Sequence, residues 1–427
     1  MAAATESKRV AVVGAGPAGL CAAKHCRDAS FDCTVFEQSG YLGGTWLYTD
    51  CTRTDEYGAP IHTSMYSNLK TNLPKEVMMF PGIPYKNEKD SYLTSEEVLE
   101  YINDYADKFQ LRSLCKFHHL VTKICRRESE WEMTVEDLQN KASCTYYFDI
   151  LFICNGVNNT PFTAHIEGVE HFRGCSMHSH EYRKSESFLG QRVLVVGGGP
   201  SGMDLTEHIS RCADKVFMSH HSKTIKNLRF RSNVEIKPDV RRLLEHSVEF
   251  TDDSVEDIDT LVYCTGFSKN YKFLDESCGI TEDQGLVYPL YKHCINANHP
   301  SMCVLGNLVY SMQFPTFDIQ VRFFMKTLSN NILPGHKEML EDIKENMDRK
   351  LADGASKKAF FRTRTDEDRI YFNQLVELTK IEPIPRVLTN IHADAVVQLL
   401  QNFGQFRNNK YEIVDDENFL FYPATSV

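Results

Sequence analysis

RVAVVGAGPAG, residues 9–19, is the stretch of this sequence that decides the fold. The β-branched run before the first glycine predicts a buried strand, and the apolar spacing of Leu20–Cys26 predicts a helix directly after the last one. Gly14 permits a tight turn, Gly16 lets the backbone approach a pyrophosphate, and Gly19 lets the helix pack closely on the strand. The positive end of the helix dipole then faces the phosphates. The stretch therefore predicts a dinucleotide-binding βαβ unit.

An acidic residue and two later segments indicate which dinucleotide this unit binds. The strand Cys33–Phe36 ends at Glu37, where an acid favours the free ribose hydroxyls of FAD or NAD. Gly43-Gly44-Thr45-Trp46 resembles the second flavin-contact segment of flavoproteins that have two dinucleotide units. Phe148–Cys154 predicts an apolar strand that runs into a glycine turn at Gly156, as in the segment that closes over the flavin nucleotide. Together these features favour FAD.

A second unit repeats the pattern about 180 residues later. The strand Val193–Val196 leads into GGGPSG at residues 197–202, then into a predicted helix, Met203–Cys212, and a strand, Lys215–Ser219. No acid follows this strand, and a carboxylate there would repel a 2′-phosphate, whereas hydroxyl and basic groups would hold it. NADPH is therefore expected. The basic residues within reach of the 2′-phosphate are Lys223, Lys226, Arg229 and Arg231. The second unit ends with a predicted strand at 260–263, which is followed by a glycine turn.

Composition and charge exclude several classes of protein. The 427 residues include 42% hydrophobic ones, which is typical of globular chains. A net charge of −11 argues against binding to nucleic acid or to an anionic membrane. No apolar run reaches the length of a spanning helix, and the N-terminus lacks the apolar core of a signal peptide, so a cytoplasmic protein is expected. A homo-oligomer is compatible with these observations.

Two dinucleotide units imply that NADPH donates a hydride to the flavin, and three classes of reaction then compete. Disulfide reduction needs a pair of redox cysteines, but the 14 cysteines include no Cys-x-x-Cys, and Cys51 follows the Gly-Gly-Thr segment alone. Reduced thiols and no metal site are therefore expected. Two classes of reaction remain: oxygen activation, and electron delivery by a reductase to a protein partner. A non-enzymatic nucleotide sensor is a further alternative.

A third motif, between the two units, resembles the identifying motif of the flavin-containing monooxygenases, Phe-x-Gly-x-x-x-His-x-x-x-Tyr. Here it reads Phe172, Gly174, His178 and Tyr182. The segment Leu69–Glu76, which contains Asn72, is similar to the family's active-site Asn segment. Within the family, the chain is most similar in general character to the compact insect members that include pyrrolizidine-alkaloid N-oxygenases.

The resemblance implies an α/β fold with two Rossmann-like domains: an FAD domain at 1–167 and 286–427, with an NADPH domain at 168–285 inserted into it. It implies FAD- and NADPH-dependent transfer of one O2 oxygen, through a C4a-hydroperoxyflavin, to an amine or sulfide. Asn72 is the implied catalytic residue, and His178 and Tyr182 are assigned to shaping the lid between the domains. The implied FAD-binding residues are Gly14, Ala15, Gly16, Pro17, Ala18, Gly19, Glu37, Gly44, Thr45, Trp46, Thr71, Asn72, Leu73, Val121, Gly156 and Gln320. The implied NADPH-binding residues are Gly197, Gly199, Pro200, Ser201, Gly202, Met203, Asp204, Ser219, Lys223, Thr265 and Gly266.

Helices over 337–351, Tyr371–Leu378 and Ala393–Phe403 are expected to serve as scaffold or oligomer contacts. Phe80, Phe314 and Phe317 are candidates for lining the substrate pocket.

Overall fold

The computed structural model describes residues 7–222, 225, 228–330 and 332–424, and its first sheet has seven strands in the order β20-β21-β22-β7-β1-β2-β3. The strands β22, β7, β1, β2 and β3 run parallel, as expected for a sheet covered on both faces. Their bounds are β1 (Arg9–Val13), β2 (Asp32–Phe36), β3 (Cys115–Lys116), β7 (Ile150–Ile153), β20 (Leu290–Tyr291), β21 (Ile295–Asn296) and β22 (Met302–Val304).

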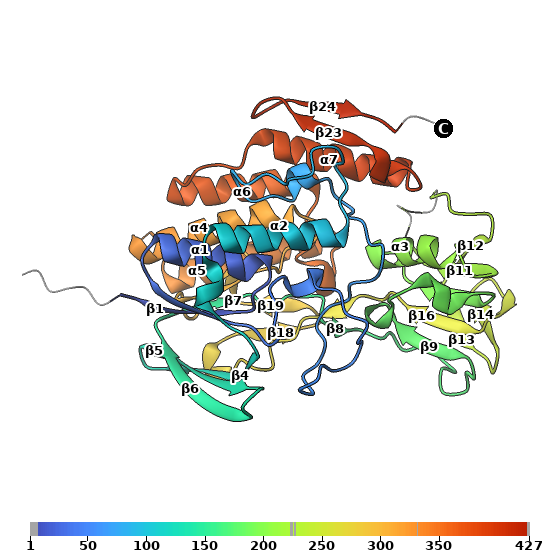
Figure 1. Ribbon diagram of the computed structural model, residues 1–427, viewed down its shortest axis with the longest axis horizontal. Helices are drawn as coiled ribbons and strands as arrows, with labels where there is room; N and C mark the ends of the chain where they lie inside the picture. Colours follow the sequence, from blue (N-terminus) through green and yellow to red (C-terminus); the bar gives the residue numbers. More distant parts are fainter. Residues whose placement is uncertain (1–6, 223–224, 226–227, 331, 425–427) are drawn as a thin grey trace, which may run out of the picture.

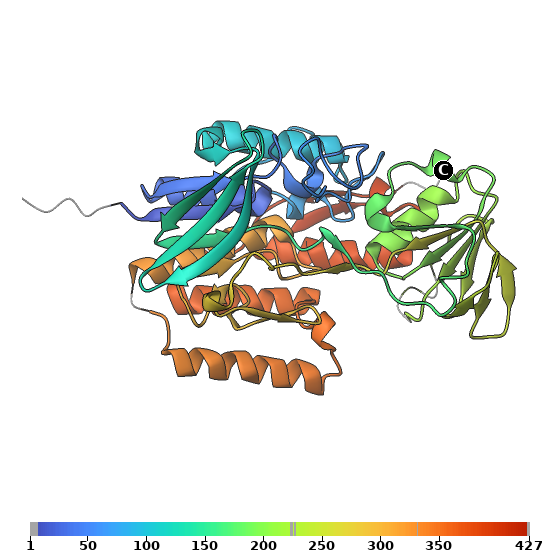
Figure 2. The ribbon, with the colours of Figure 1, turned by 90° about the horizontal axis from the view of Figure 1, so that it is seen from below.

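Helices from both ends of the chain cover this sheet (Figure 1). The helix α1 packs against α4, α4 against α6, and α6 against α7. Figure 2 shows α5 at the outer side of this layer. The bounds are α1 (Pro17–Asp28), α2 (Ser95–Lys108), α4 (Gln313–Ser329), α5 (His336–Ala352), α6 (Thr365–Thr379) and α7 (Arg386–Gln401), and the hairpin of β23 (Lys410–Ile413) and β24 (Phe419–Tyr422) lies beyond α7.

A second, fully parallel sheet has five strands in the order β12-β11-β10-β16-β9. Its central β11-β10-β16 arrangement repeats β2-β1-β7 of the first sheet, with α3 (Pro200–Ile209) following β10 as α1 follows β1. Two dinucleotide-binding folds are thus confirmed. The bounds are β9 (Cys175–His178), β10 (Arg192–Val196), β11 (Lys215–Ser219), β12 (Val234–Lys237) and β16 (Thr260–Tyr263), and a small antiparallel sheet adds β13 (Val240–Leu243), β14 (Ser247–Phe250) and β15 (Val255–Asp257).

The chain crosses between the two sheets at two places that lie side by side. The outgoing strand β8 (Thr160–Pro161) and the returning strand β17 (Phe267–Ser268) pair in antiparallel fashion. The second fold is therefore inserted within the first.

The sequence did not predict a three-stranded antiparallel sheet of β4 (His119–Arg127), β5 (Glu130–Asp137) and β6 (Ala142–Phe148). The prediction of one strand over 148–154 is wrong, because Phe148 ends β6 and Asp149 separates it from β7. The Asp149 carboxylate accepts from the backbone N–H of Arg9 and pairs with its guanidinium at 2.8 Å. This ion pair fixes the corner between the two strands.

Three predicted helices have different bounds. The helix α3 ends at Ile209 rather than at Cys212; α6 begins at Thr365, before Tyr371; and α7 begins at Arg386 and ends at Gln401. The helix predicted over 337–351 is confirmed as α5.

Two of the phenylalanines predicted to line a pocket lie in the core instead. Phe80 and Phe314 are each 2% exposed, and their rings stack with centroids 4.9 Å apart between α2 and α4. Their side chains join these helices and have no surface to offer a substrate.

Candidate active site

The first glycine loop is a cradle with no room for side chains where it turns. A Cβ on Gly14 would lie 2.6 Å from the carbonyl oxygen of Cys154, and one on Gly19 would lie 1.9 Å from the oxygen of Gly14. Gly14 also has a φ of +100°, which few other residues tolerate. The Cα of Gly16 lies 3.0 Å from the Cβ position of Gly44. The structure therefore brings the two segments predicted to contact FAD together.

The helix that follows this loop starts in a way that suits a phosphate. Gly16 is the N-cap residue of α1 and supplies no side-chain hydrogen bond to the first turn. The N–H groups of that turn are available, and the helix dipole favours an anion there. The bare backbone, the close glycine contacts and the uncapped helix fit the pyrophosphate of FAD.

The predicted ribose ligand Glu37 lies beside the same loop. Its carboxylate is 4% exposed and accepts hydrogen bonds from the backbone N–H of Ala15 at 2.8 Å and from the N–H and hydroxyl of Ser39. These bonds hold the acid at the end of β2, against the glycine turn.

The remaining residues predicted to bind FAD are spread over several environments. Thr45, Asn72 and Gly156 are exposed, and Trp46 and Leu73 are partly exposed, whereas Val121 is buried in β4. Gln320 is 1% exposed, and its side-chain amide donates to the Tyr371 hydroxyl at 2.8 Å. This bond joins α4 to α6 and leaves the Gln320 amide with no surface directed toward a ligand.

The second glycine loop repeats the first. Cβ atoms on Gly197 and Gly202 would lie 2.3 Å from the oxygen of Cys264 and 1.9 Å from the oxygen of Gly197. Gly199 is the N-cap of α3, again without a side-chain cap, and a Cβ there would meet nothing within 4 Å. Beside it, Pro200 is exposed and Ser201 is partly exposed. The geometry fits a second pyrophosphate above Gly199.

Two glycine variants separate folding from nucleotide binding in this loop. Gly202→Ala is expected to destabilise the domain, because its Cβ collides with backbone. Gly199→Ala is expected to fold normally, since the space around it is empty, yet to weaken NADPH binding about tenfold by occupying the phosphate side of the loop. Thermal melting and NADP⁺ titration calorimetry check both variants. Equal loss of stability in the two would contradict this assignment.

Residues predicted to hold the 2′-phosphate lie in different environments. Ser219 is 2% exposed and its hydroxyl donates to the carbonyl of Pro238 at 2.7 Å, so this group already has an internal partner. Lys223 and Lys226 lie outside the described residues. Arg229 is exposed, and Arg231 forms an ion pair with Glu207 at 3.3 Å.

Asn72 lies on a loop whose backbone is firmly held while its own side chain is exposed. The N–H of Thr71 donates to the carbonyl of Leu93 at 2.8 Å, and the Leu93 N–H donates to the Thr71 hydroxyl at 3.1 Å. Within the described part of the chain, the Asn72 amide makes no hydrogen bond and is free to meet a ligand. The N-terminus of α2 supports this loop, and Leu99 of the same helix contacts Gly43.

His178 of the interdomain motif uses both ring nitrogens inside the protein. Nε2–H donates to the carbonyl of Gly266 at 3.0 Å, while Nδ1 accepts from the N–H of His180 at 3.1 Å. This is the neutral tautomer, and burial lowers the pKa of the ring below its usual value. His178 therefore fixes the Thr265–Gly266 turn and has no nitrogen left for proton transfer.

Tyr182 joins the two folds through aromatic packing. It is 1% exposed, and its ring meets that of Tyr66 edge to face at 5.4 Å. Tyr66 comes from the segment before Asn72, so the motif and the Asn72 loop share one small core.

Sequence reasoning missed Arg183, the residue after the motif. Its guanidinium is buried and makes bonds of 2.6 to 3.5 Å to five backbone carbonyls, which come from both sides of the interdomain boundary. The acceptors are Thr49, Cys51, Thr63, His180 and Tyr182. A single arginine in a sequence carries no signal for such a role.

Asp204, predicted to bind NADPH, has a different role for its side chain. It is 6% exposed; one oxygen accepts from the Tyr66 hydroxyl, and the other pairs with Arg407 at 2.8 Å. Both oxygens face protein groups from the first fold, so the carboxylate is not directed at a nucleotide.

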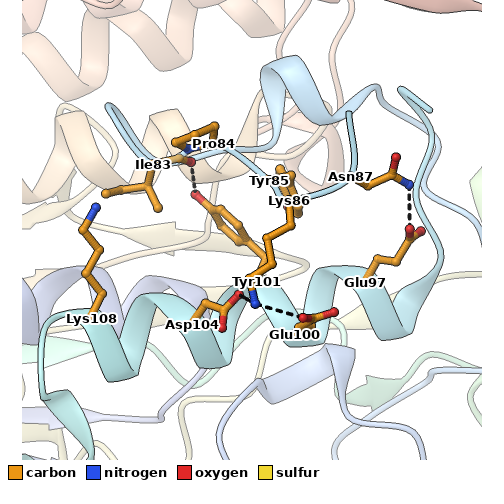
Figure 3. A pocket seen from close by; sticks show the side chains of 10 residues that line it. All are labelled: Ile83, Pro84, Tyr85, Lys86, Asn87, Glu97, Glu100, Tyr101, Asp104 and Lys108. Carbon is orange, nitrogen blue, oxygen red and sulfur yellow. Dashed lines mark hydrogen bonds and ion pairs between the residues drawn. The ribbon is translucent and has the colours of Figure 1, made fainter. Parts of the chain in front are cut away.

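A surface pocket beside α2 (Figure 3) does not belong to this site. Lys86 lies over it and pairs with Glu100 and Asp104, and Asn87 donates to Glu97. Because these polar groups satisfy one another, the pocket offers little to a ligand.

The fold and the two glycine cradles define the class of protein: one with two dinucleotide-binding domains. Comparisons with known proteins narrow this class. The family model described as "Flavin-binding monooxygenase-like" matches residues 7–226 and 223–418. Senecionine N-oxygenase of Tyria jacobaeae is 32% identical over 97% of this chain and 92% of its own length. Flavin-containing monooxygenase FMO GS-OX-like 6 of Arabidopsis thaliana is 33% identical over 79% of this chain and 76% of its own.

Solved structures agree with this family. S-allyl-L-cysteine S-oxygenase from Allium sativum superposes with a TM-score of 0.87 at 27% identity, covering 94% of this chain and 95% of its own. Tmm from Pelagibacter sp. strain HTCC7211 gives a TM-score of 0.83 at 25% identity, covering 94% and 93%.

The chain belongs to the flavin-binding monooxygenase-like family. It is an oxidoreductase that uses FAD and NADPH. The alternative, a reductase that passes electrons to a protein partner, has no support, because the relatives are oxygenases. Among the described helices, none combines the length and apolar character needed to cross a membrane.

Proposed function

We propose that this monooxygenase oxygenates soft nucleophiles, converting tertiary amines to N-oxides and sulfides to S-oxides, with alkaloids of the pyrrolizidine type as its physiological substrates. The observation that carries the proposal is the exposed Asn72 amide on a loop fixed by Thr71 and Leu93. The match to a senecionine N-oxygenase along nearly the whole chain supports the substrate class.

Bound FAD and NADPH would supply the activated oxygen and the hydride. Asn72 offers an uncharged donor and acceptor, so it can hold a polar oxygen without protonating it. His178 positions the Thr265–Gly266 turn, and the packed rings of Tyr66 and Tyr182 exclude water from the boundary between the folds. No side-chain acid or base is assigned, since the neutral amine or sulfide brings its own lone pair.

We also propose that residues 1–167 and 286–427 form the FAD domain and that residues 168–285 form the NADPH domain. We expect the protein to lie in the cytoplasm and to have no nucleic-acid partner, and a homo-oligomer is compatible with its role. Cell fractionation and light scattering on the purified protein check location and assembly.

The dependence of rate on pH tests the proposed chemistry. Below the pKa of a tertiary amine, kcat/KM for that amine is expected to rise about tenfold per pH unit, because only the unprotonated nitrogen can attack. A sulfide has no such proton, and the lowered pKa of His178 keeps this ring neutral above pH 7. Product formation from an alkaloid and from a sulfide, measured between pH 7 and 9, checks this. Parallel pH profiles, or no N-oxide at any pH, would overturn the proposal.

A further inference from the structure

The C-terminal segment after α7 reaches the second fold at two points. The rings of Phe403 and Phe230 lie with centroids 5.4 Å apart, and Arg407, in the short helix η8 (Phe406–Asn408), forms its ion pair with Asp204 of α3. The same segment is anchored on the first fold, where the ring of Phe406 packs edge to face on Tyr92.

Arg407 contacts both folds at once. One terminal nitrogen lies 2.8 Å from Asp204, while Nε–H donates to the carbonyl oxygen of Thr71 at 3.0 Å. The two side chains of the ion pair are 20% and 9% exposed, so water screens the pair only weakly. A planar guanidinium can hold two acceptors in a fixed relation, which a lysine cannot.

The two acceptors belong to the two halves of the proposed active site. Asp204 lies in the second turn of α3, the helix whose first turn faces the second glycine loop. Thr71 directly precedes Asn72. The hydroxyl of Tyr66, from the same segment as Thr71, also donates to Asp204 and closes the cluster.

We propose that Arg407 is a positioning residue that couples NADP⁺ binding at the second glycine loop to the placement of Asn72. A nucleotide bound at the N-terminus of α3 reduces the motion of this helix and of Asp204. Through its ion pair with Asp204 and its hydrogen bond to Thr71, Arg407 then restrains the backbone of Thr71 as well. The inference deepens the proposed function and rests on its assignment of Asn72 and of the second glycine loop. Because coupling is reciprocal, loosening Arg407 weakens NADP⁺ binding as well.

Hydrogen exchange on the full-length FAD-loaded protein tests the coupling without any substrate. In the wild type, NADP⁺ is expected to slow exchange in residues 66–78. In Arg407→Met this protection is expected to disappear, and NADP⁺ affinity in calorimetry to fall about fivefold or more. Arg349→Met is the matched control, because Arg349 lies on α5 and its guanidinium bonds only its neighbour Asn346 among the described residues. This variant should behave as wild type.

Two further variants keep the test decisive if Arg407→Met folds poorly. Asp204→Asn keeps an acceptor for Tyr66 but removes the ion pair, and it should lose the protection too. Arg407→Lys keeps the charge without the second donor arm, so its melting temperature should recover while the protection of residues 66–78 does not. Full NADP⁺-dependent protection in Arg407→Lys or in Asp204→Asn would overturn the inference. Because hydrogen exchange is measured without substrate, its result tests the coupling even if the protein fails to oxygenate amines.

Discussion

Asn72→Asp is expected to lower the rate of oxygenated product formation about 100-fold, the scale on which enzymes lose rate when one placed donor is removed. The variant keeps the shape of the side chain but replaces a neutral donor with a negative acceptor. The loop should keep its position, because its bonds come from the backbone and hydroxyl of Thr71 and not from Asn72. FAD should remain bound and NADPH should still be consumed, with hydrogen peroxide replacing product. Mass spectrometry of the N-oxide and a peroxide assay measure the two fates.

Asn68→Asp is the matched control for this variant. Asn68 lies four residues earlier on the same loop, is exposed, and has a φ of +61°, a conformation that aspartate also tolerates. It carries the same change of charge at a different place, and it should leave product formation within about twofold of the wild type, as expected for an exposed position. Undiminished oxygenation in Asn72→Asp, or an equal loss in Asn68→Asp, would remove Asn72 from its assigned role.

Arg183→Met is expected to lower the free energy of unfolding by about 3 kcal/mol or more. The variant fills a similar volume but leaves several buried carbonyls without a donor, and each lost bond to a charged group costs about 1.5–3 kcal/mol. Denaturant titration, followed by far-UV circular dichroism, measures the change.

Arg173→Met provides the comparison. Arg173 lies ten residues earlier, is exposed, and has no side-chain hydrogen bond to any described residue. Its replacement should alter stability by no more than about 0.5 kcal/mol. If the two methionine variants unfolded at the same denaturant concentration, the five carbonyl bonds of Arg183 would contribute nothing measurable.

The parts of the fold that the sequence predicts are those whose cause is local. The turn at Gly14 and the helix after it were predictable because the glycines and apolar residues that specify them are neighbours in the sequence, and a side chain at Gly19 would collide with the backbone oxygen of Gly14, five residues earlier. The same holds for the second loop. His178 and Tyr182 were found through a motif, and their partners became known only with the structure.

The parts that the sequence could not predict depend on contacts between distant segments. Arg407 meets Thr71 across 336 positions, and Arg183 meets Thr49 across 134. Asp204 has the spacing of a nucleotide ligand, and only the approach of Tyr66 and Arg407 gives its carboxylate another role. The corner at Asp149 was missed for the same reason, since the pairing with Arg9 is non-local.

The pairing of β8 with β17 has a consequence for how such proteins can diversify. The chain leaves the first fold at Thr160 and returns opposite it at Ser268, and paired residues on antiparallel strands lie only about 5 Å apart. The second sheet and its helix are thus inserted between two adjacent points of the chain, as an exchangeable module would be. Recombination between relatives at these two strands would therefore replace the second fold and leave the path of the chain through the first fold unchanged. Contacts between the two folds, such as those of Arg183 and Arg407, would then have to be compatible in the recombinant protein.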